Sequence, residues 1–155
     1  MTIIVRSANE ADTAAMSQVL VASISELCTA DHGNDPGKLS AWLANKSPDG
    51  VRAMLANPQG QLFVAELDDA IAAVGAISGD GSITLNYVAP AMRFRGVSKA
   101  MLTRLEAELR ALGFAQARLE ATATAKSFYE SQGWLADGPQ ARGRMVNGYP
   151  MLKTL

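Results

Sequence analysis

The spacing of apolar side chains at the start of the chain predicts a strand followed by a helix. Residues 2–6 form a short β-branched stretch, which is typical of a strand. Apolar side chains then recur every three or four positions, at Met16, Leu20, Ile24 and Leu27. That period places them on one face of an amphipathic helix. Asn9, with Asp12 three residues later, indicates a capped helix start.

Glycine and proline recur between residues 28 and 58, and they interrupt any long regular element there. Two short helical patterns lie among these breaks, at 39–44 and 51–56. We therefore expect short helices joined by loops in this segment.

The period of the pattern changes after Gly60, where three stretches at 62–66, 70–77 and 82–88 are typical of strands. The connections between them are only a few residues long and are rich in aspartate and glycine. Such tight connections predict an antiparallel meander. Gly75 lies inside the second strand. We interpret it as a tolerated glycine, with a bulge or a close backbone approach as the alternative.

The second half of the chain begins with a strongly amphipathic helix at 98–112. Its apolar face consists of Met101, Leu102, Leu105, Leu109 and Leu112. Arg110 lies in its last turn and Gly113 just beyond, which is typical of a helix end. A strand at 117–121, a short helix at 125–132 ended by Gly133, and a strand around 145–152 complete the predicted order.

Length and composition favour one domain over residues 1–155, because 48% hydrophobic residues can bury a core and 155 residues are too few for two. The formal net charge of -1 gives no global positive field, so we expect neither a nucleic-acid nor a membrane partner. We find no apolar stretch of signal-peptide or membrane-span length, and we expect a cytoplasmic protein. Cys28 and His32 are the only cysteine and histidine. One cysteine and one histidine are too few for an internal disulfide or a Cys/His zinc cluster. We therefore expect no metal, with a metal site made only of carboxylates as the alternative.

A loop between residues 88 and 98 joins the third strand of the meander to the strongest helix. It contains Arg93, Arg95, Gly96 and Ser98. The first N–H groups of a helix have no intrahelical partner and carry the positive end of the helix dipole, and glycine lets a ligand approach the backbone. This segment predicts a site for a polyanion. The alternative is an ordinary capped helix with Ser98 near its start.

The loop has the pattern Arg93-x-x-Gly96-x-Ser98, and residues 125–134 have the sequence AKSFYESQGW. The first pattern resembles the pyrophosphate loop, Gln/Arg-x-x-Gly-x-Gly/Ala, of the GNAT superfamily of acyl-CoA-dependent N-acyltransferases. The second is similar to that family's Ala-x-x-Phe-Tyr-Glu-x-x-Gly-Phe element. The resemblance implies an α+β fold with a mixed, mostly antiparallel, splayed sheet of six to seven strands flanked by helices. It also implies transfer of an acetyl or short acyl group from acetyl-CoA to a primary amine, in a ternary complex.

The resemblance also implies which residues bind coenzyme A. These are Val88, Arg93, Phe94, Arg95, Gly96, Val97, Ser98, Lys99, Ala100, Thr122, Lys126, Ser127 and Tyr129. The backbone N–H of Val88 would face the thioester carbonyl. Tyr129 would protonate the departing thiolate, because a phenol with a pKa near 10 is protonated at neutral pH. Its alternative role is that of a tyrosine packed on the sheet.

The general base and the acceptor site have candidate residues but no motif of their own. The strand before the loop has Ser82, Thr84 and Asn86 where family members with a clear catalytic base have glutamate. Asn86 or Glu120 could order a water that takes the amine proton, although both residue types more often make structural hydrogen bonds. In the family, the region after the first helix lines the acceptor pocket, which makes His32 and Trp42 candidates for binding a small-molecule or peptide amine. Cys28 is interpreted as a small buried hydrophobe.

Two other functions compete with the enzyme. A CoA-binding sensor of the same fold would keep the phosphate loop without turnover, and a homodimer is compatible with either reading. A nucleotide-binding α/β protein is less favoured, because the sequence contains neither a Gly-x-x-x-x-Gly-Lys-Ser/Thr loop nor a Gly-x-Gly-x-x-Gly turn.

Overall fold

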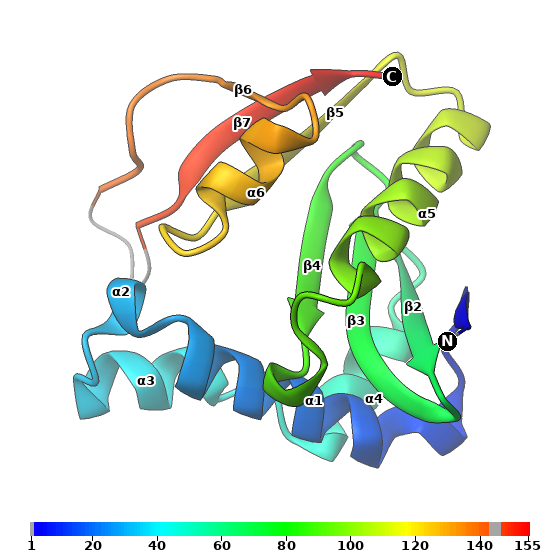
Figure 1. The fold of residues 1–155 in the computed structure, drawn as a ribbon, viewed down its shortest axis with the longest axis vertical. Coiled ribbons are helices and arrows are strands. Elements are labelled where there is room, and N and C mark those ends of the chain that lie inside the picture. Colours follow the sequence, from blue (N-terminus) through cyan, green and yellow to red (C-terminus); the bar gives the residue numbers. More distant parts are fainter. Residues whose placement is uncertain (1, 143–146) are drawn as a thin grey trace.

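The computed structural model describes residues 2–142 and 147–155 of the chain (Figure 1). In chain order, the elements of the first half are β1 (Ile3–Ser7), the 3-10 turn η1 (Glu10–Asp12), α1 (Thr13–Leu27), α2 (Thr29–His32), α3 (Pro36–Leu43), α4 (Pro48–Ala56), β2 (Gly60–Leu67) and β3 (Ala70–Ser78). Those of the second half are β4 (Ile83–Val88), the 3-10 turn η2 (Pro90–Met92), α5 (Val97–Ala111), β5 (Gln116–Ala121), α6 (Lys126–Ser131), β6 (Leu135–Ala136) and β7 (Tyr149–Thr154).

The described strands form two sheets that meet along one short line. The first has the order β1-β2-β3-β4 and the second β5-β7-β6, and every ladder within them is antiparallel. A single parallel bridge between Ser82 and Arg118 connects β4 to β5. The predicted α+β class, with a mixed, mostly antiparallel, splayed arrangement of six to seven strands flanked by helices, is therefore confirmed.

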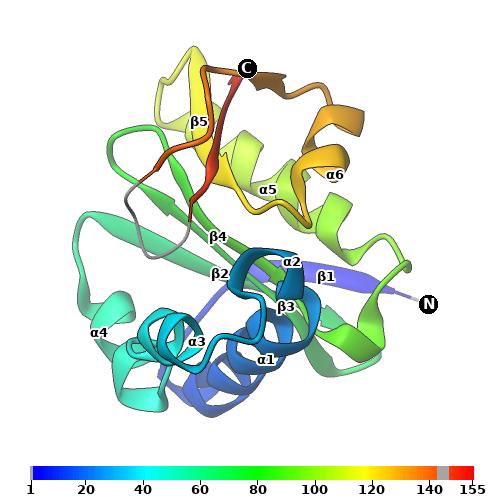
Figure 2. The same cartoon turned by 90° about the vertical axis from the view of Figure 1, so that its left-hand side faces the viewer.

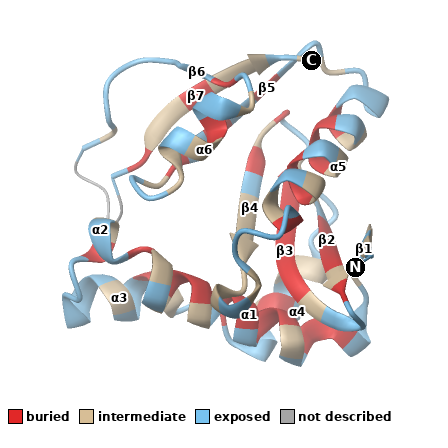
Figure 3. Ribbon diagram, viewed as in Figure 1, coloured by how far each residue is buried: buried red, intermediate tan, exposed pale blue. Residues whose placement is uncertain are grey.

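Helices cover both faces of the first sheet. α1, α3 and α4 lie on one side, and α5 lies on the other (Figure 2). Figure 3 shows that buried positions concentrate on β2, β3 and the sides of α1 and α5 that face them. On the α1 side the core includes Met16, Leu20, Val51, Val64 and Val74. On the α5 side it continues into the second sheet and includes Phe63, Met101, Leu105, Leu119 and Met151.

Gly75 on β3 is required by the close packing of α5. A Cβ at this position would lie 2.5 Å from Met101 Sδ and 3.1 Å from Leu105 Cδ1. Interior side chains pack at crystal-like density, so this overlap cannot be absorbed without a shift. The interpretation of Gly75 as a tolerated glycine is wrong, and the alternative of a close approach is correct. The β3–β4 register also shifts next to it, between Ala76 and Ile77.

The elements predicted from spacing are present, and outside the C-terminal strand their ends differ by at most three residues. The antiparallel meander is β2-β3-β4, and the predicted helix at 98–112 is α5. The one-turn helix α2 and the two-residue strand β6 were not predicted, because elements this short carry no period. Of the strand expected around 145–152, residues 149–152 lie in β7, and residues 145–146 lie outside the described residues. No helix within the described ranges is long and apolar enough to cross a membrane.

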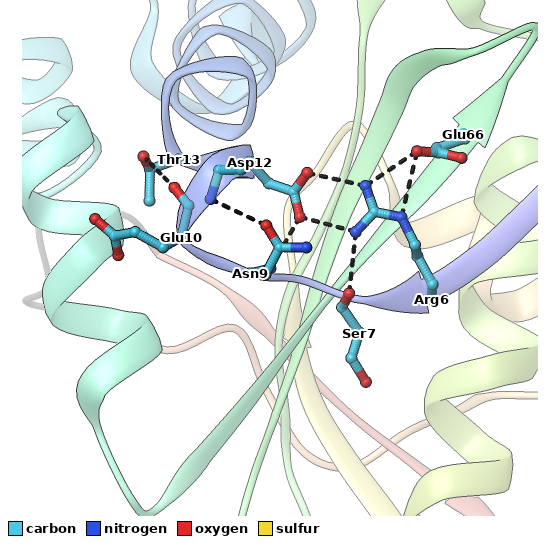
Figure 4. Close-up of polar contacts among 8 residues, drawn as sticks. Arg6, Ser7, Asn9, Glu10, Asp12, Thr13 and Glu66 are labelled. Carbon is cyan, nitrogen blue, oxygen red and sulfur yellow. Dashed lines mark hydrogen bonds and ion pairs between the residues drawn. The ribbon is translucent and has the colours of Figure 1, made fainter.

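An ion-pair network joins β1, η1 and β2 at the edge of the first sheet (Figure 4). The Arg6 guanidinium donates to both carboxylate oxygens of Asp12, at 2.8 and 2.9 Å, and to Glu66 Oε1. Asp12 also accepts the Asn9 backbone N–H at 2.8 Å, which completes the capping box predicted from Asn9 and Asp12. The hydrogen bond from Arg6 is the main reason that the pKa of the buried Asp12 carboxyl is lowered.

We predict that Arg6→Met lowers the free energy of unfolding by about 1 to 3 kcal/mol at pH 7, because it leaves Asp12 buried without its cation. A carboxyl whose pKa is lowered on folding stabilises the protein above its unfolded pKa of about 3.9 and loses that effect as the pH falls through its folded pKa. The difference in free energy of unfolding between wild type and variant should therefore shrink below about pH 4. Urea titrations at several pH values measure it.

The control is Arg52→Met, which removes the exposed ion pairs of Arg52 with Glu10 and Asp49. That variant should lose less than about 0.5 kcal/mol. Equal losses in the two variants, or a loss at Arg6 that does not depend on pH, would contradict the role given to Asp12.

Candidate functional site

The two sheets diverge at the strands β4 and β5, which run parallel from the bridge between Ser82 and Arg118 (Figure 1). β4 is the edge strand of the first sheet. Ala89 donates its N–H to Ala72 on β3, at 2.7 Å. Since successive N–H groups of a strand point to opposite sides, the N–H of Val88 points away from β3 and towards β5. The gap between the sheets therefore has a backbone edge along one side.

The loop after β4 directs the N-terminus of α5 towards this gap. Phe94 and Gly96 have φ angles of +62° and +82°, and Gly96 is the N-cap of α5. No side chain caps the helix, so the alternative of a helix capped by Ser98 is not supported. The first turn contains no acidic residue. The N–H groups at the start of α5 and its dipole are thus available to an anion.

A cavity of about 310 Å³ lies between the diverging strands and reaches this helix start. Most of the predicted donor-site and catalytic residues line it, namely Asn86, Val88, Arg93, Phe94, Gly96, Val97, Ser98, Lys99, Glu120, Thr122 and Tyr129. Arg95, Ala100, Lys126 and Ser127 are not among its lining residues. Lys126 instead places its Nζ 5.2 Å from the centre of the Tyr149 ring. We name the space between the sheets the donor cavity.

Tyr129 lies at the inner wall of the donor cavity, on α6, and is 6% exposed. Its ring contacts Phe128 and Trp134 edge-on, at centroid distances of 5.3 and 5.9 Å. Burial raises the pKa of the phenol to about 12, and a polar contact with Asn86 opposes that rise. Tyr129 is therefore protonated at neutral pH. It can donate a proton to an anion that forms in the cavity.

The two candidates for ordering a water, Asn86 and Glu120, lie on different faces of the gap. Leu119 and Ala121 on β5 are buried in the core shared with α5 and α6, so the exposed Glu120 between them points the other way. Asn86 lies on the α6 side, beside Tyr129. The structure does not bring the two side chains together as one site.

A second cavity, of about 540 Å³, lies on the Glu120 side of the gap. Its lining includes Trp42, Thr84, Tyr87, Asp80, Glu120 and Asp137. Thr84, Tyr87 and Glu120 line the donor cavity as well, so the same two strands separate the cavities. Trp42, a predicted acceptor residue, lies in this second cavity. We name it the acceptor-side cavity for its position relative to Trp42.

His32, the other predicted acceptor residue, lines neither cavity and is 1% exposed. Its Nε2 is 2.9 Å from the Ile24 carbonyl oxygen, and its Nδ1 accepts the Asn34 N–H at 3.0 Å. The ring also contacts Trp42 edge-on. Because both nitrogens are used inside the fold, His32 holds the corner between α1 and α2, and its prediction as an acceptor residue is not supported.

The end of α1 contributes residues that sequence reasoning did not assign to the site. Ser23, Leu27 and Cys28 line the donor cavity. Cys28 is 4% exposed, and burial raises the pKa of its thiol to about 12. This agrees with the prediction of a buried hydrophobe. Burial also raises the pKa of Tyr87, which stands between the two cavities. The α1 residues carry no motif, so only packing identifies them.

Asp31 on α2 closes one end of the gap by binding the loop between β5 and α6. Its carboxylate accepts the Ala123 N–H at 2.6 Å and the Thr124 hydroxyl at 3.2 Å, across 92 and 93 positions of sequence. The Thr122 hydroxyl oxygen accepts the Ala125 N–H at 3.1 Å in the same loop. These contacts hold the start of α6, and therefore Tyr129, against the first half of the chain.

Taken together, these groups suit an elongated anionic ligand. Its phosphates would meet the start of α5, an extended arm would pair with the β4 edge, and a reactive end would lie beside Tyr129. Among residues 2–142 and 147–155, no group of three or more His, Cys, Asp or Glu side chains is arranged to hold a metal ion.

Residues 15–155 match the model of the family described as an acetyltransferase (GNAT) domain. A search of curated protein sequences gives no match. Among solved structures, a GCN5-related N-acetyltransferase from Rhodopseudomonas palustris has a TM-score of 0.86 at 23% identity, covering 100% of this chain and 97% of that chain. PaiA N-acetyltransferase from Thermoplasma acidophilum, in complex with coenzyme A, has a TM-score of 0.79 at 18% identity, with 100% of both chains covered. YncA from Salmonella typhimurium, with its cofactor acetyl-CoA, has a TM-score of 0.65 at 20% identity, covering 99% of this chain and 94% of that chain. These likenesses show the fold.

We predict that the native Cys28 thiol reacts with a disulfide reagent such as DTNB at least about 100-fold more slowly at pH 8 than the thiol of the urea-unfolded chain, because the reactive species is the thiolate. Absorbance at 412 nm measures both rates. The unfolded chain serves as the control, since it should release one equivalent from its one cysteine. A fast native reaction would show that Cys28 is an accessible thiolate.

Proposed function

The chain belongs to the acetyltransferase (GNAT) family, and on this basis we propose that it transfers an acetyl group from acetyl-CoA to the primary amine of a small molecule or peptide. One observation carries the proposal: a single cavity reaches from the uncapped start of α5, along the edge of β4, to the buried phenol of Tyr129. Coenzyme A is a chain with phosphates at one end and a thiol at the other, so its anionic end and its reactive end match the two ends of this path.

The phosphates bind at residues 96–99, where backbone N–H groups and the helix dipole offset their charge. Arg93 and Lys99, both cavity-lining, add positive charge. The pantetheine arm extends along β4, where its amides pair with the strand edge near Val88. Two solved structures of the same fold, PaiA with coenzyme A and YncA with acetyl-CoA, support this use of the fold.

In the reaction, the nitrogen of the neutral amine attacks the thioester carbonyl carbon and forms the C–N bond; an acceptor that arrives as an ammonium ion first releases one proton to water. The Val88 N–H donates to the oxyanion, and the C–S bond then breaks. The Tyr129 hydroxyl gives its proton to the departing sulfur, and the phenolate takes the proton that the nitrogen releases. The proton count closes within the site, because the nitrogen loses one proton and the sulfur gains one.

The acceptor enters from the acceptor-side cavity. This direction leaves the donor cavity to acetyl-CoA and places Trp42 and Glu120 along the acceptor. Asp80 and Asp137 also line this cavity, and their carboxylates favour a cationic amine over an anionic one.

A sensor that binds coenzyme A without turnover is the second candidate function. The observation that favours it is the donor-cavity wall, where Glu120 is the only carboxylate among the described lining residues and points away from Tyr129. The position of Tyr129 favours the enzyme. Substitution of Tyr129 distinguishes the two candidates.

We predict that acetyl-CoA binds the wild-type chain and raises its Tm, and that Gly96→Glu weakens this binding at least about tenfold more than Gly96→Gln. Both side chains must adopt the same positive φ of +82° and so share the backbone strain, but only glutamate places a negative charge beside the phosphates. Isothermal titration measures the affinities. Equal affinities in the pair would show that the phosphates bind elsewhere, and no binding to wild type would refute both candidate functions.

We predict that Tyr129→Phe lowers kcat roughly 10²- to 10⁴-fold, while the affinity for acetyl-CoA changes little. The change removes the acidic hydroxyl and retains the packed ring. Steady-state kinetics on an amine found by screening polyamines, aminoglycosides, amino acids and lysine peptides for CoA release would measure it. An unchanged kcat together with a lower Tm would assign Tyr129 a purely structural role. Tight CoA binding by wild type without transfer to any amine would favour the sensor.

A further inference from the structure

Asn86 on β4 presents a buried oxygen that no group in the described part of the chain satisfies. Its Oδ1 is inaccessible to solvent and has no hydrogen-bond partner there. Buried acceptors are nearly always paired in folded proteins, and an unpaired one is destabilising. The residue lines the donor cavity. Because Oδ1 has no partner, any polar contact of this side chain is made by its NH₂ group.

The strand register explains why this side chain reaches Tyr129. Asn86 pairs with Gly75 across the β3–β4 ladder, so no side chain on β3 competes for the space beside it. Its neighbours Leu85 and Tyr87 pack towards α1, and strand alternation therefore sends Asn86 to the α6 side. Tyr129 lies on that side, in the same cavity.

The side chains of Asn86 and Tyr129 are in polar contact, and this contact lowers the pKa of the phenol against the rise caused by burial. Since Asn86 Oδ1 has no hydrogen-bond partner among the described residues, the NH₂ end of the amide makes this contact. A donor at the phenol oxygen stabilises the phenolate, which agrees with the direction of the effect on the pKa.

We propose that Asn86 is a positioning residue that aims the Tyr129 proton at the thioester sulfur. The inference rests on the proposed function. A phenol has one hydrogen and two lone pairs, so a hydrogen bond received from Asn86 leaves the hydroxyl hydrogen free for the sulfur. Asn86 itself neither gains nor loses a proton during the transfer.

The first test substitutes Asn86→Asp and follows kcat across pH 5 to 9. Above the pKa of the new carboxyl group, the carboxylate accepts the phenol hydrogen and turns it away from the sulfur, so kcat should fall at least tenfold at pH 8. When protonated, the same group can donate as the amide does, so the ratio of variant to wild-type kcat should rise as the pH falls. The KM for acetyl-CoA should stay within twofold. A ratio that does not change with pH would overturn the proposal.

The second test measures coupling between the two residues. Asn86→Leu should lower kcat at least tenfold in the wild-type background and less than threefold in the Tyr129→Phe background, which has no proton to aim. The matched control is Thr103→Val, which removes a hydroxyl from the exposed side of α5 and should leave kcat unchanged. Equal losses in both backgrounds would show that Asn86 acts independently of Tyr129.

The third measurement does not require turnover. Asn86→Leu replaces an unsatisfied polar group by an apolar one, so the Tm without ligand should equal or exceed that of wild type. A fall in Tm of several degrees with unchanged kcat would assign Asn86 a structural role and overturn the proposal. If wild type transfers acetyl to no amine, the proposed function fails and this inference with it. An active wild type with unaffected variants contradicts the inference alone.

Discussion

The separation of β4 from β5 is the constraint on which the rest of the structure depends. The two strands touch at the bridge between Ser82 and Arg118 and then part, which leaves backbone groups of β4 directed into the gap. In a continuous sheet, these groups would pair with β5, and no cavity would form. Here α5 packs tightly against β3 through Gly75, and Asp31 ties the far end of the gap to the loop before α6. The fold thus fixes both ends of the gap between the sheets and keeps the donor cavity open.

The anion affinity that we propose for the donor cavity has a local origin, since the chain as a whole carries a formal charge of -1. The start of α5 supplies backbone N–H groups, and Gly96 supplies the left-handed turn that exposes them. Burial of Tyr129 raises its pKa to about 12, which keeps the phenol protonated. The proposed anion binding and the proposed proton donation therefore belong to two ends of one cavity.

The residues predicted for the site differ in how far the fold engages their polar groups. Both ring nitrogens of His32 are engaged within the fold. Asn86 Oδ1, by contrast, is buried and unsatisfied within the described residues, on the side chain that contacts Tyr129. His32 therefore maintains the structure and is not a candidate for binding the acceptor.

The sequence by itself determined the order of the longer elements, the antiparallel meander, and the places along the chain of the Arg93–Ser98 loop and of Tyr129, because these depend on residue spacing within a few turns or on motifs of about ten residues. Only the tertiary structure showed that Cys28 lines the donor cavity, that His32 is buried, that Asp31 binds a loop 92 positions away and that Gly75 makes room for Met101. It also separated Asn86 from Glu120, which sequence reasoning had treated alike. The physical reason is that spacing along the chain encodes local periodicity and strand alternation, whereas contacts between layers depend on how those elements pack against each other.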